Sequence, residues 1–225
     1  MKYINGKRAE KHLFEMTPLE RAICEFENKA ETFHSARKNS SCIQQELARK
    51  KAHLDLQRRT TEACAQVQTQ LDIYRDEARK KKLLNKEEPH HPTETLAKFM
   101  SIEGYPKPDK NCECHHIIQG KGKSQVYATQ ARLRLHMCGI GINDPDNGVW
   151  LPSNINDTPH WAMKKALPHK VIHTAKYDQW VATKMLSANN EPVARIILGN
   201  LRRDLQNGDV PLENLTQKSR IRLGL

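Results

Sequence analysis

The second half of the chain carries histidines in two pairs whose spacing constrains the fold more than any other feature. His115 and His116 are adjacent in a segment that continues as Ile-Ile. Side chains alternate along a strand, so this pair presents one imidazole on each face. His169 and His173 are four residues apart, which puts both rings on one face of a helix, where they can converge on one ion. Between the pairs, Asn147-Gly148 suits a tight turn. This order of strand, turn and helix predicts a metal site.

A longer ordered series of motifs surrounds these histidines. It runs from about Leu96 to Trp180 and comprises Leu96-Ala97-Lys98, Gly104-Tyr105-Pro106, Cys114-His115-His116-Ile117-Ile118, Gly139 to Asp144, Asn147 to Pro152 and His169…His173…Tyr177. The series resembles the HNH/endonuclease VII superfamily and, within it, the AHH branch found in bacterial polymorphic toxins. Cys114 stands where the name of that branch has Ala. The resemblance implies a ββα-metal fold and a metal-dependent endonuclease, and it leaves out the first ninety residues.

Roles for individual residues follow from the resemblance. It implies that His116 is the general base and that His115 is a metal ligand, with His169 and His173 completing the metal site from the helix. Because His115 and His116 point to opposite faces of a regular strand, a bulge or twist is expected to bring both to one site. Asn147 either orients the loop by bonding to the backbone, which is the favoured role, or touches the metal through its side-chain oxygen.

Further candidates lie close to these residues. His160 either replaces His169 as a ligand or packs in the core, and Tyr177, one turn beyond His173, either bonds to a ligand ring or packs. Cys112-x-Cys114 invites comparison with a zinc knuckle, although the usual Cys-x-x-Cys pair is missing. The implied cofactor is a divalent metal ion, with Mg²⁺, Zn²⁺, Ni²⁺ and Mn²⁺ all open.

The charge of the chain points to a polyanionic partner. Its formal net charge is +11, and lysine and arginine release counterions when they bind phosphates. The excess is spread over both halves, so charge alone does not locate a patch. No apolar run approaches twenty residues and no apolar signal segment follows Met1, so neither membrane insertion nor general secretory export is expected.

The first half of the chain has the pattern of a helical hairpin. Thr17-Pro18-Leu19-Glu20 is a capping box that starts a helix with a heptad-like apolar seam. Asn39-Ser40-Ser41 interrupts this helix, and Ser41 can cap a second, longer one. A polar segment from Asn85 to Pro92, which contains His90-His91, reads as a linker. We therefore expect a helical hairpin or adaptor in residues 1–88 and a nuclease domain in residues 89–225, with its core at about 96–180.

Within the second domain the pattern predicts a mostly helical α+β structure. The expected elements are a short helix over 93–100, a strand near 113–118, a helix over 127–137, a strand over 149–151, helix from 157 to 180 with a break at Pro168, and a helix over 192–206. The strands and the helix beginning near His169 form the expected ββα unit.

The expected activity is hydrolysis of phosphodiester bonds, most simply in double-stranded DNA without sequence specificity, with RNA also open. Resemblance to polymorphic toxins implies an antibacterial effector that is made in the bacterial cytoplasm without a signal peptide. A type VI or similar secretion system would then deliver it into the cytoplasm of a target cell. A cognate immunity protein is the expected inhibitor, and the N-terminal helices are the expected contact for the secretion machinery or a chaperone. The alternative is a non-catalytic, metal-stapled module that binds nucleic acid and dimerises through its helical arm.

Overall fold

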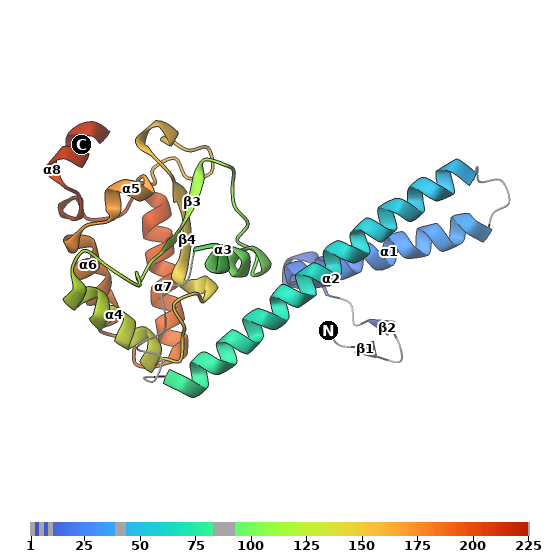
Figure 1. Cartoon of the computed structure of the whole chain (residues 1–225), viewed down its shortest axis with the longest axis horizontal. Helices are drawn as coiled ribbons and strands as arrows, with labels where there is room; N and C mark the ends of the chain where they lie inside the picture. Colours follow the sequence, from blue (N-terminus) through green and yellow to red (C-terminus); the bar gives the residue numbers. More distant parts are fainter. Residues whose placement is uncertain (1–2, 5–6, 9–10, 39–43, 83–92, 225) are drawn as a thin grey trace. The chain divides into compact units, whose positions relative to one another are not determined.

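The computed structural model describes residues 3–4, 7–8, 11–38, 44–82 and 93–224 and divides the chain into two compact units (Figure 1). One unit comprises Met1–Gln70 with Ile102–Gly104, and the other comprises Leu71–Ser101 with Tyr105–Leu225. The fold is mostly helical with small antiparallel sheets, which confirms the expected α+β class. No helix in the described part of the chain is both long and apolar enough to span a bilayer.

The first unit is built around a helical hairpin. Helix α1 (Pro18–Lys38) and helix α2 (Gln44–Lys81) run antiparallel, and the second is the longer (Figure 1). The predicted capping box is present: the Thr17 N–H donates to Glu20 Oε2 (3.0 Å), and the Glu20 N–H donates to Thr17 Oγ1 (3.2 Å). The expected interruption at 39–41 and the cap at Ser41 lie outside the described residues. Two short strands, β1 (Tyr3–Ile4) and β2 (Lys7–Arg8), and the 3₁₀ turn η1 (Leu13–Glu15) precede the hairpin.

The second unit contains the end of α2 and the remaining elements. They are α3 (Thr93–Ile102), β3 (Cys112–His116), α4 (Gln125–Met137), η3 (Pro145–Asn147), β4 (Gly148–Pro152), η4 (Ile155–Asp157), α5 (His169–Ile172), α6 (Ala175–Met185), α7 (Glu191–Asn207), η5 (Leu212–Asn214) and α8 (Gln217–Leu223). The predicted helices that became α3, α4 and α7 are confirmed to within two residues at each end. The expected linker, with its His90-His91 pair, falls among the residues that the structure does not describe.

Strands β3 and β4 form the small sheet that supports the site. They pair antiparallel in an unbroken register in which His115 faces Val149 and His116 faces Gly148. Of the two alternatives expected, a bulge or a twist, the bulge is absent, because no extra residue interrupts the pairing. Helix α7 packs against β4, and α4 packs against α6 (Figure 1). The hydrophobic core includes Leu151 of β4 together with Leu198 and Leu201 of α7.

Two further expectations were wrong. Asn147-Gly148 does not form a tight turn: Asn147 ends η3, and Gly148 begins β4 with a negative φ of −113°. Packing favours the glycine instead, because a Cβ there would lie 2.4 Å from Met100 Sδ and the Met100 side chain would have to shift. The expected helix from 157 to 180 is also broken more widely than at Pro168. Residues 158–168 are irregular, with proline at both 159 and 168, and proline removes a helical hydrogen-bond donor.

Candidate metal centre

The histidines predicted from the sequence meet at the end of strand β3, where a cavity of about 470 Å³ opens. Its walls include the His115-His116 pair, the loop 119–123 and the two histidines at the ends of the short helix α5. His169 is the first residue of α5, and His173 follows its last residue. His115 and His116 lie on opposite faces of β3, but the strand ends at His116. Both faces therefore border the same cavity, and no bulge is needed to bring the two rings to it.

His115, His169 and His173 form a compact cluster of imidazoles. Each offers a ring nitrogen within 4.8 Å of the others. The ring centroids are 5.0 Å apart for His115 with either partner and 4.6 Å apart for His169 and His173. The Nε2 atoms of His169 and His173 are 2.8 Å apart. Two imidazole nitrogens on one tetrahedral zinc lie about 3.3 Å apart, given bonds of about 2.0–2.1 Å, so a shift of a few tenths of an ångström would seat an ion.

Tyr177 sets the tautomer of His115. The Tyr177 hydroxyl donates its proton to the Ile117 carbonyl (2.9 Å), and His115 Nε2 lies 3.0 Å from the same hydroxyl. Since that proton is already used, the hydroxyl accepts from His115 Nε2–H. The other nitrogen, Nδ1, then keeps the lone pair of the neutral ring. Burial, with the charges of the neighbouring histidines, lowers the pKa of His115 well below its ordinary value, which favours this neutral form.

Glu113 does the same for His169. Its Oε2 lies 2.6 Å from His169 Nδ1, so the carboxylate accepts a proton held on Nδ1 and leaves the lone pair on Nε2. Glu113 was not predicted from the sequence. The available signal was its position two residues before His115, on the same face of the strand. Burial, then the charges of His169 and Lys123, lower the pKa of His173 to about 4, so this ring is neutral near pH 7.

His116 borders the same cavity but is held by a different partner. Its Nε2 lies 2.9 Å from Asn143 Oδ1, which can only accept, so Nε2 carries the proton and Nδ1 the lone pair. Both side chains are buried. Asn143 was part of the Gly139 to Asp144 motif in the sequence, but nothing there singled it out as the partner of His116.

Asn147 holds the backbone of the loop that joins the two strands. Its Oδ1 accepts from the Ile118 N–H (2.8 Å), while its Nδ2 donates to the carbonyls of Ile118 (3.0 Å) and Ile142 (2.8 Å). The residue is fully buried. Its side chain therefore orients the loop, and its oxygen is engaged with the backbone instead of facing the imidazole cluster.

His160 lies in a separate group with Asp109 and Cys112, beside the first residue of β3. The Ala162 N–H donates to His160 Nδ1 (3.2 Å), so the ring proton is on Nε2, which donates to Asp109 Oδ2 (2.9 Å). This arrangement leaves no lone pair on the nitrogen that faces Cys112, so it favours a hydrogen-bonded anchor over a metal site. Cys114 points elsewhere, with its Sγ 3.5 Å from Met100 Sδ, so the two cysteines do not form a zinc knuckle.

The loop 119–123 adds positive charge to the rim of the cavity through Lys121 and Lys123. Asp178 of α6 anchors this loop, because its Oδ2 accepts from the Ser124 N–H (2.7 Å). Gly122 approaches the same carboxylate so closely that a Cβ would lie 2.6 Å from Asp178 Oδ2. The two lysines therefore stand on a loop whose base is fixed.

Comparison with known families gives a match in the second half of the chain. Residues 96–208 match AHH, described as a nuclease family of the HNH/ENDO VII superfamily with conserved AHH. The chain belongs to this family. No curated protein and no solved structure matches the chain.

As an AHH nuclease, the chain is an endonuclease that acts on nucleic acid, and nucleases of this superfamily use a divalent metal ion. The residues present fit such an ion. Three imidazoles converge, and two of them donate to Glu113 and to Tyr177, which orients their lone pairs as is found around metal-binding histidines.

Proposed function

We propose that this AHH nuclease cleaves double-stranded DNA without sequence specificity, with His115, His169 and His173 holding one divalent ion and His116 acting as the general base. The observation that carries the proposal is the convergence of the three rings in one cavity with His116. The hydrogen bonds of Tyr177, Glu113 and Asn143 are what a working site needs, since they fix which nitrogen of each partner ring carries a proton.

The reaction is attack of a water oxygen on phosphorus, with cleavage of the bond from phosphorus to the leaving oxygen. The bound ion supplies neutralisation of charge on the phosphate and on the leaving oxygen. His116 takes the water proton at Nδ1, because Asn143 keeps the ring proton on Nε2. The Asn143 contact then stabilises the resulting imidazolium, whose Nε2–H still donates to a neutral oxygen acceptor.

Lys121 and Lys123 are proposed to bind phosphates of the substrate backbone beside the cleaved bond. Both border the cavity, and the loop that carries them is anchored through its backbone, because Asp178 accepts from the Ser124 N–H. Phosphate contacts of this kind bind the backbone irrespective of sequence. This supports a nonspecific nuclease.

A supercoiled-plasmid assay with Mg²⁺, Mn²⁺, Zn²⁺ or Ni²⁺ tests the activity and identifies the supporting ion. The His116→Ala variant should lose cleavage by about 10²–10⁴-fold, the range for a general base, while it still binds the ion. His34→Ala, which removes an exposed imidazole of α1, is the matched control and should cut normally. A parallel assay on double-stranded RNA distinguishes the substrates. Undiminished cleavage by His116→Ala would show that another group is the base, and binding without cleavage by the intact chain would favour a non-catalytic module.

We further propose that the nuclease is an antibacterial effector neutralised by a cognate immunity protein. The resemblance to the AHH branch of polymorphic toxins supports this role, and the basic charge of the chain favours an acidic inhibitor. The N-terminal helical hairpin is the proposed contact for a specialised secretion system or a chaperone, which would deliver the chain to the cytoplasm of a rival cell.

Cytosolic expression in bacteria tests the toxin role. The wild-type chain should kill the host and fragment its DNA, and His116→Ala at equal abundance should do neither. Survival of cells that contain active wild-type nuclease would remove the toxin role and leave the nuclease activity standing.

A further inference from the structure

The last turns of helix α2 contact the loop that leads into strand β4. The Asn143 N–H donates to the Tyr74 hydroxyl at 2.8 Å. Gly141 lies directly against the same hydroxyl, since a Cβ at that position would be 2.2 Å from it. A glycine is therefore required at 141 for the tyrosine to reach the backbone of the loop.

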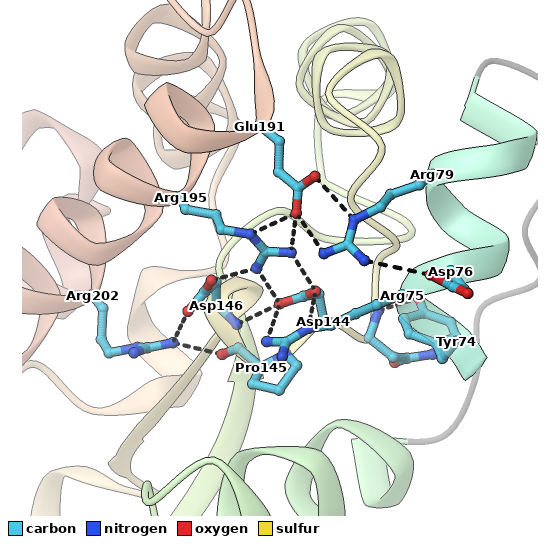
Figure 2. A network of polar contacts seen from close by, with 11 residues as sticks. Tyr74, Arg75, Asp76, Arg79, Asp144, Pro145, Asp146, Glu191, Arg195 and Arg202 are labelled. Atoms are coloured by element: carbon cyan, nitrogen blue, oxygen red, sulfur yellow. Dashed lines mark hydrogen bonds and ion pairs between the residues drawn. The ribbon is translucent and has the colours of Figure 1, made fainter. Parts of the chain in front are cut away.

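A second residue of α2, Arg75, binds Asp144, the next residue of the loop. Arg75 donates to both carboxylate oxygens of Asp144, at 3.0 and 3.4 Å, and Arg195 of α7 donates to the same two oxygens at 3.0 and 3.2 Å (Figure 2). The Asp144 side chain is only 1% exposed. Two guanidinium groups thus neutralise one buried carboxylate, and each bidentate pair fixes orientation as well as distance.

These contacts are linked to His116 through Asn143. The backbone of Asn143 is held by Tyr74, while its side-chain oxygen holds the His116 ring at Nε2. Asp144, the adjoining residue, is held by Arg75 and caps η3 by accepting from the Asp146 N–H (3.0 Å). Only one rotatable side chain, that of Asn143, separates the gripped backbone from the proposed base.

We propose that Tyr74 and Arg75 are positioning residues for catalysis, which hold Asn143 and through it fix the tautomer and direction of His116. This inference rests on the proposed role of His116 as the general base. Neither Tyr74 nor Arg75 is among the residues that line the cavity, and the cluster of three imidazoles comes from other elements. Their effect is therefore on the proton-accepting step and leaves binding of the ion and of DNA unchanged.

The proposal changes where the catalytic unit begins. Tyr74 and Arg75 lie before the matched region 96–208 and before the sequence-predicted boundary at residue 88. They belong to the compact unit that starts at Leu71. The side chain of Leu71 is itself fully buried. Helix α2 is continuous from Gln44 to Lys81, so the helix that forms the second arm of the hairpin also supplies Tyr74 and Arg75.

Steady-state kinetics on the full-length chain test the inference. Tyr74→Phe removes one hydroxyl, and it should lower kcat about tenfold, a fraction of the roughly 10²-fold loss that a misplacement of about 1 Å causes. The Tyr74→Phe/Arg75→Ala double variant should lower kcat about 100-fold. In both variants KM for DNA and the affinity for Zn²⁺ should stay within about twofold of wild type. Arg75→Lys, which keeps the charge and loses the bidentate geometry, should have a kcat between those of wild type and the single variant Arg75→Ala.

Asp76→Asn is the matched control. Asp76 lies on the same helix, and its carboxylate is paired only loosely with Arg79 at 3.6 Å on an exposed face (Figure 2). This variant should retain wild-type kcat. Nitrogen-15 chemical shifts of the His116 ring give an independent signature: the wild type should show the Nε2–H tautomer, and Tyr74→Phe should show a mixture of both tautomers.

Parallel assays of His116→Ala distinguish failure of the positioning role from failure of the assignment of His116 as the base. If His116→Ala is inactive while Tyr74→Phe retains wild-type kcat and tautomer, the positioning role is overturned and the proposed function stands. If His116→Ala also cuts normally, the assignment of the base itself fails. If Tyr74→Phe loses Zn²⁺ affinity together with kcat, its role is general support of the fold and the proposal is again overturned. Should the double variant fail to fold, the single hydroxyl removal decides the question by the same readouts.

Discussion

Replacing Tyr177 with phenylalanine removes one oxygen atom that serves two buried partners. The hydroxyl accepts from His115 Nε2–H and donates to the Ile117 carbonyl, and His115 and Ile117 are 1% and 0% exposed. A buried polar group left without a partner costs about 1–3 kcal/mol. We expect the free energy of unfolding to fall by about 2–4 kcal/mol, the lower part of the summed range, because the freed N–H can turn toward the freed carbonyl.

The same change should weaken metal binding. Without the hydroxyl, His115 is no longer held in the tautomer that leaves the lone pair on Nδ1, and loss of such an orienting partner lowers metal affinity by about 10–100-fold. Chemical denaturation in the presence of a chelator measures the stability, and competition against a chromophoric zinc chelator measures the affinity. Tyr127→Phe is the control, since the Tyr127 hydroxyl forms no hydrogen bond within the described part of the chain. Tyr177→Phe that binds zinc as tightly as wild type would refute the orienting role.

Three other perturbations have expected outcomes. Asn147→Ala deletes three buried hydrogen bonds to the loop backbone and should lower the free energy of unfolding by about 3 kcal/mol, measured by thermal denaturation. A decrease below about 1 kcal/mol would contradict the role of Asn147 in holding the loop. Burial alone would raise the pKa of Asp144, but its arginine partners outweigh burial and lower this pKa. The stabilisation that the ionised carboxylate gives is therefore complete above the ordinary aspartate pKa of about 3.9, and it should be lost as the pH falls through the lower pKa of the folded state. Acid titration monitored by circular dichroism should show this loss in wild type and a flatter profile in Asp144→Asn. Lys123→Ala should weaken DNA binding and reduce the slope of log affinity against log salt by about 0.9, whereas Lys184→Ala on the exposed face of α6 should not, and equal slopes for both would exclude a phosphate contact at Lys123.

The parts of the fold that the sequence predicted are those decided by local chemistry. The start of α1 follows from a capping box whose two hydrogen bonds join residues three apart. The meeting of His169 and His173 follows from their spacing of four along the chain, although the helix between them is only one turn long. In each case the interacting groups are neighbours in sequence, so periodicity and capping rules suffice.

The remaining features depend on contacts between distant segments. Tyr74 and Asn143 are 69 residues apart, as are Arg75 and Asp144, and no spacing rule links such pairs. Gly148 looked like a turn residue, but its role is set by Met100, which lies far away in the sequence. Glu113 could have been noticed as a partner on the ligand face of the strand, but its pairing with His169 as hydrogen-bond donor depends on the three-dimensional path of residues 158–168.

The path of β3 also shows why a bulge, one of the two alternatives expected, is not needed. Alternation does separate the rings of His115 and His116, and each indeed has its own partners: Tyr177 for the first and Asn143 for the second. The strand ends at His116, so a cavity at its end can border both rings while the pairing with β4 stays regular. The end of a strand therefore served the purpose that a bulge was predicted to serve.

The central claim is that His115, His169 and His173 together hold one divalent ion. The most direct test is the zinc content of the purified chain after equilibrium dialysis, measured by mass spectrometry for the wild type and for His173→Ala. The account predicts one zinc per wild-type chain and less than about a tenth of that in His173→Ala, because only two imidazoles would remain on the ion. Equal zinc content in the two proteins would place the ion elsewhere and contradict the account.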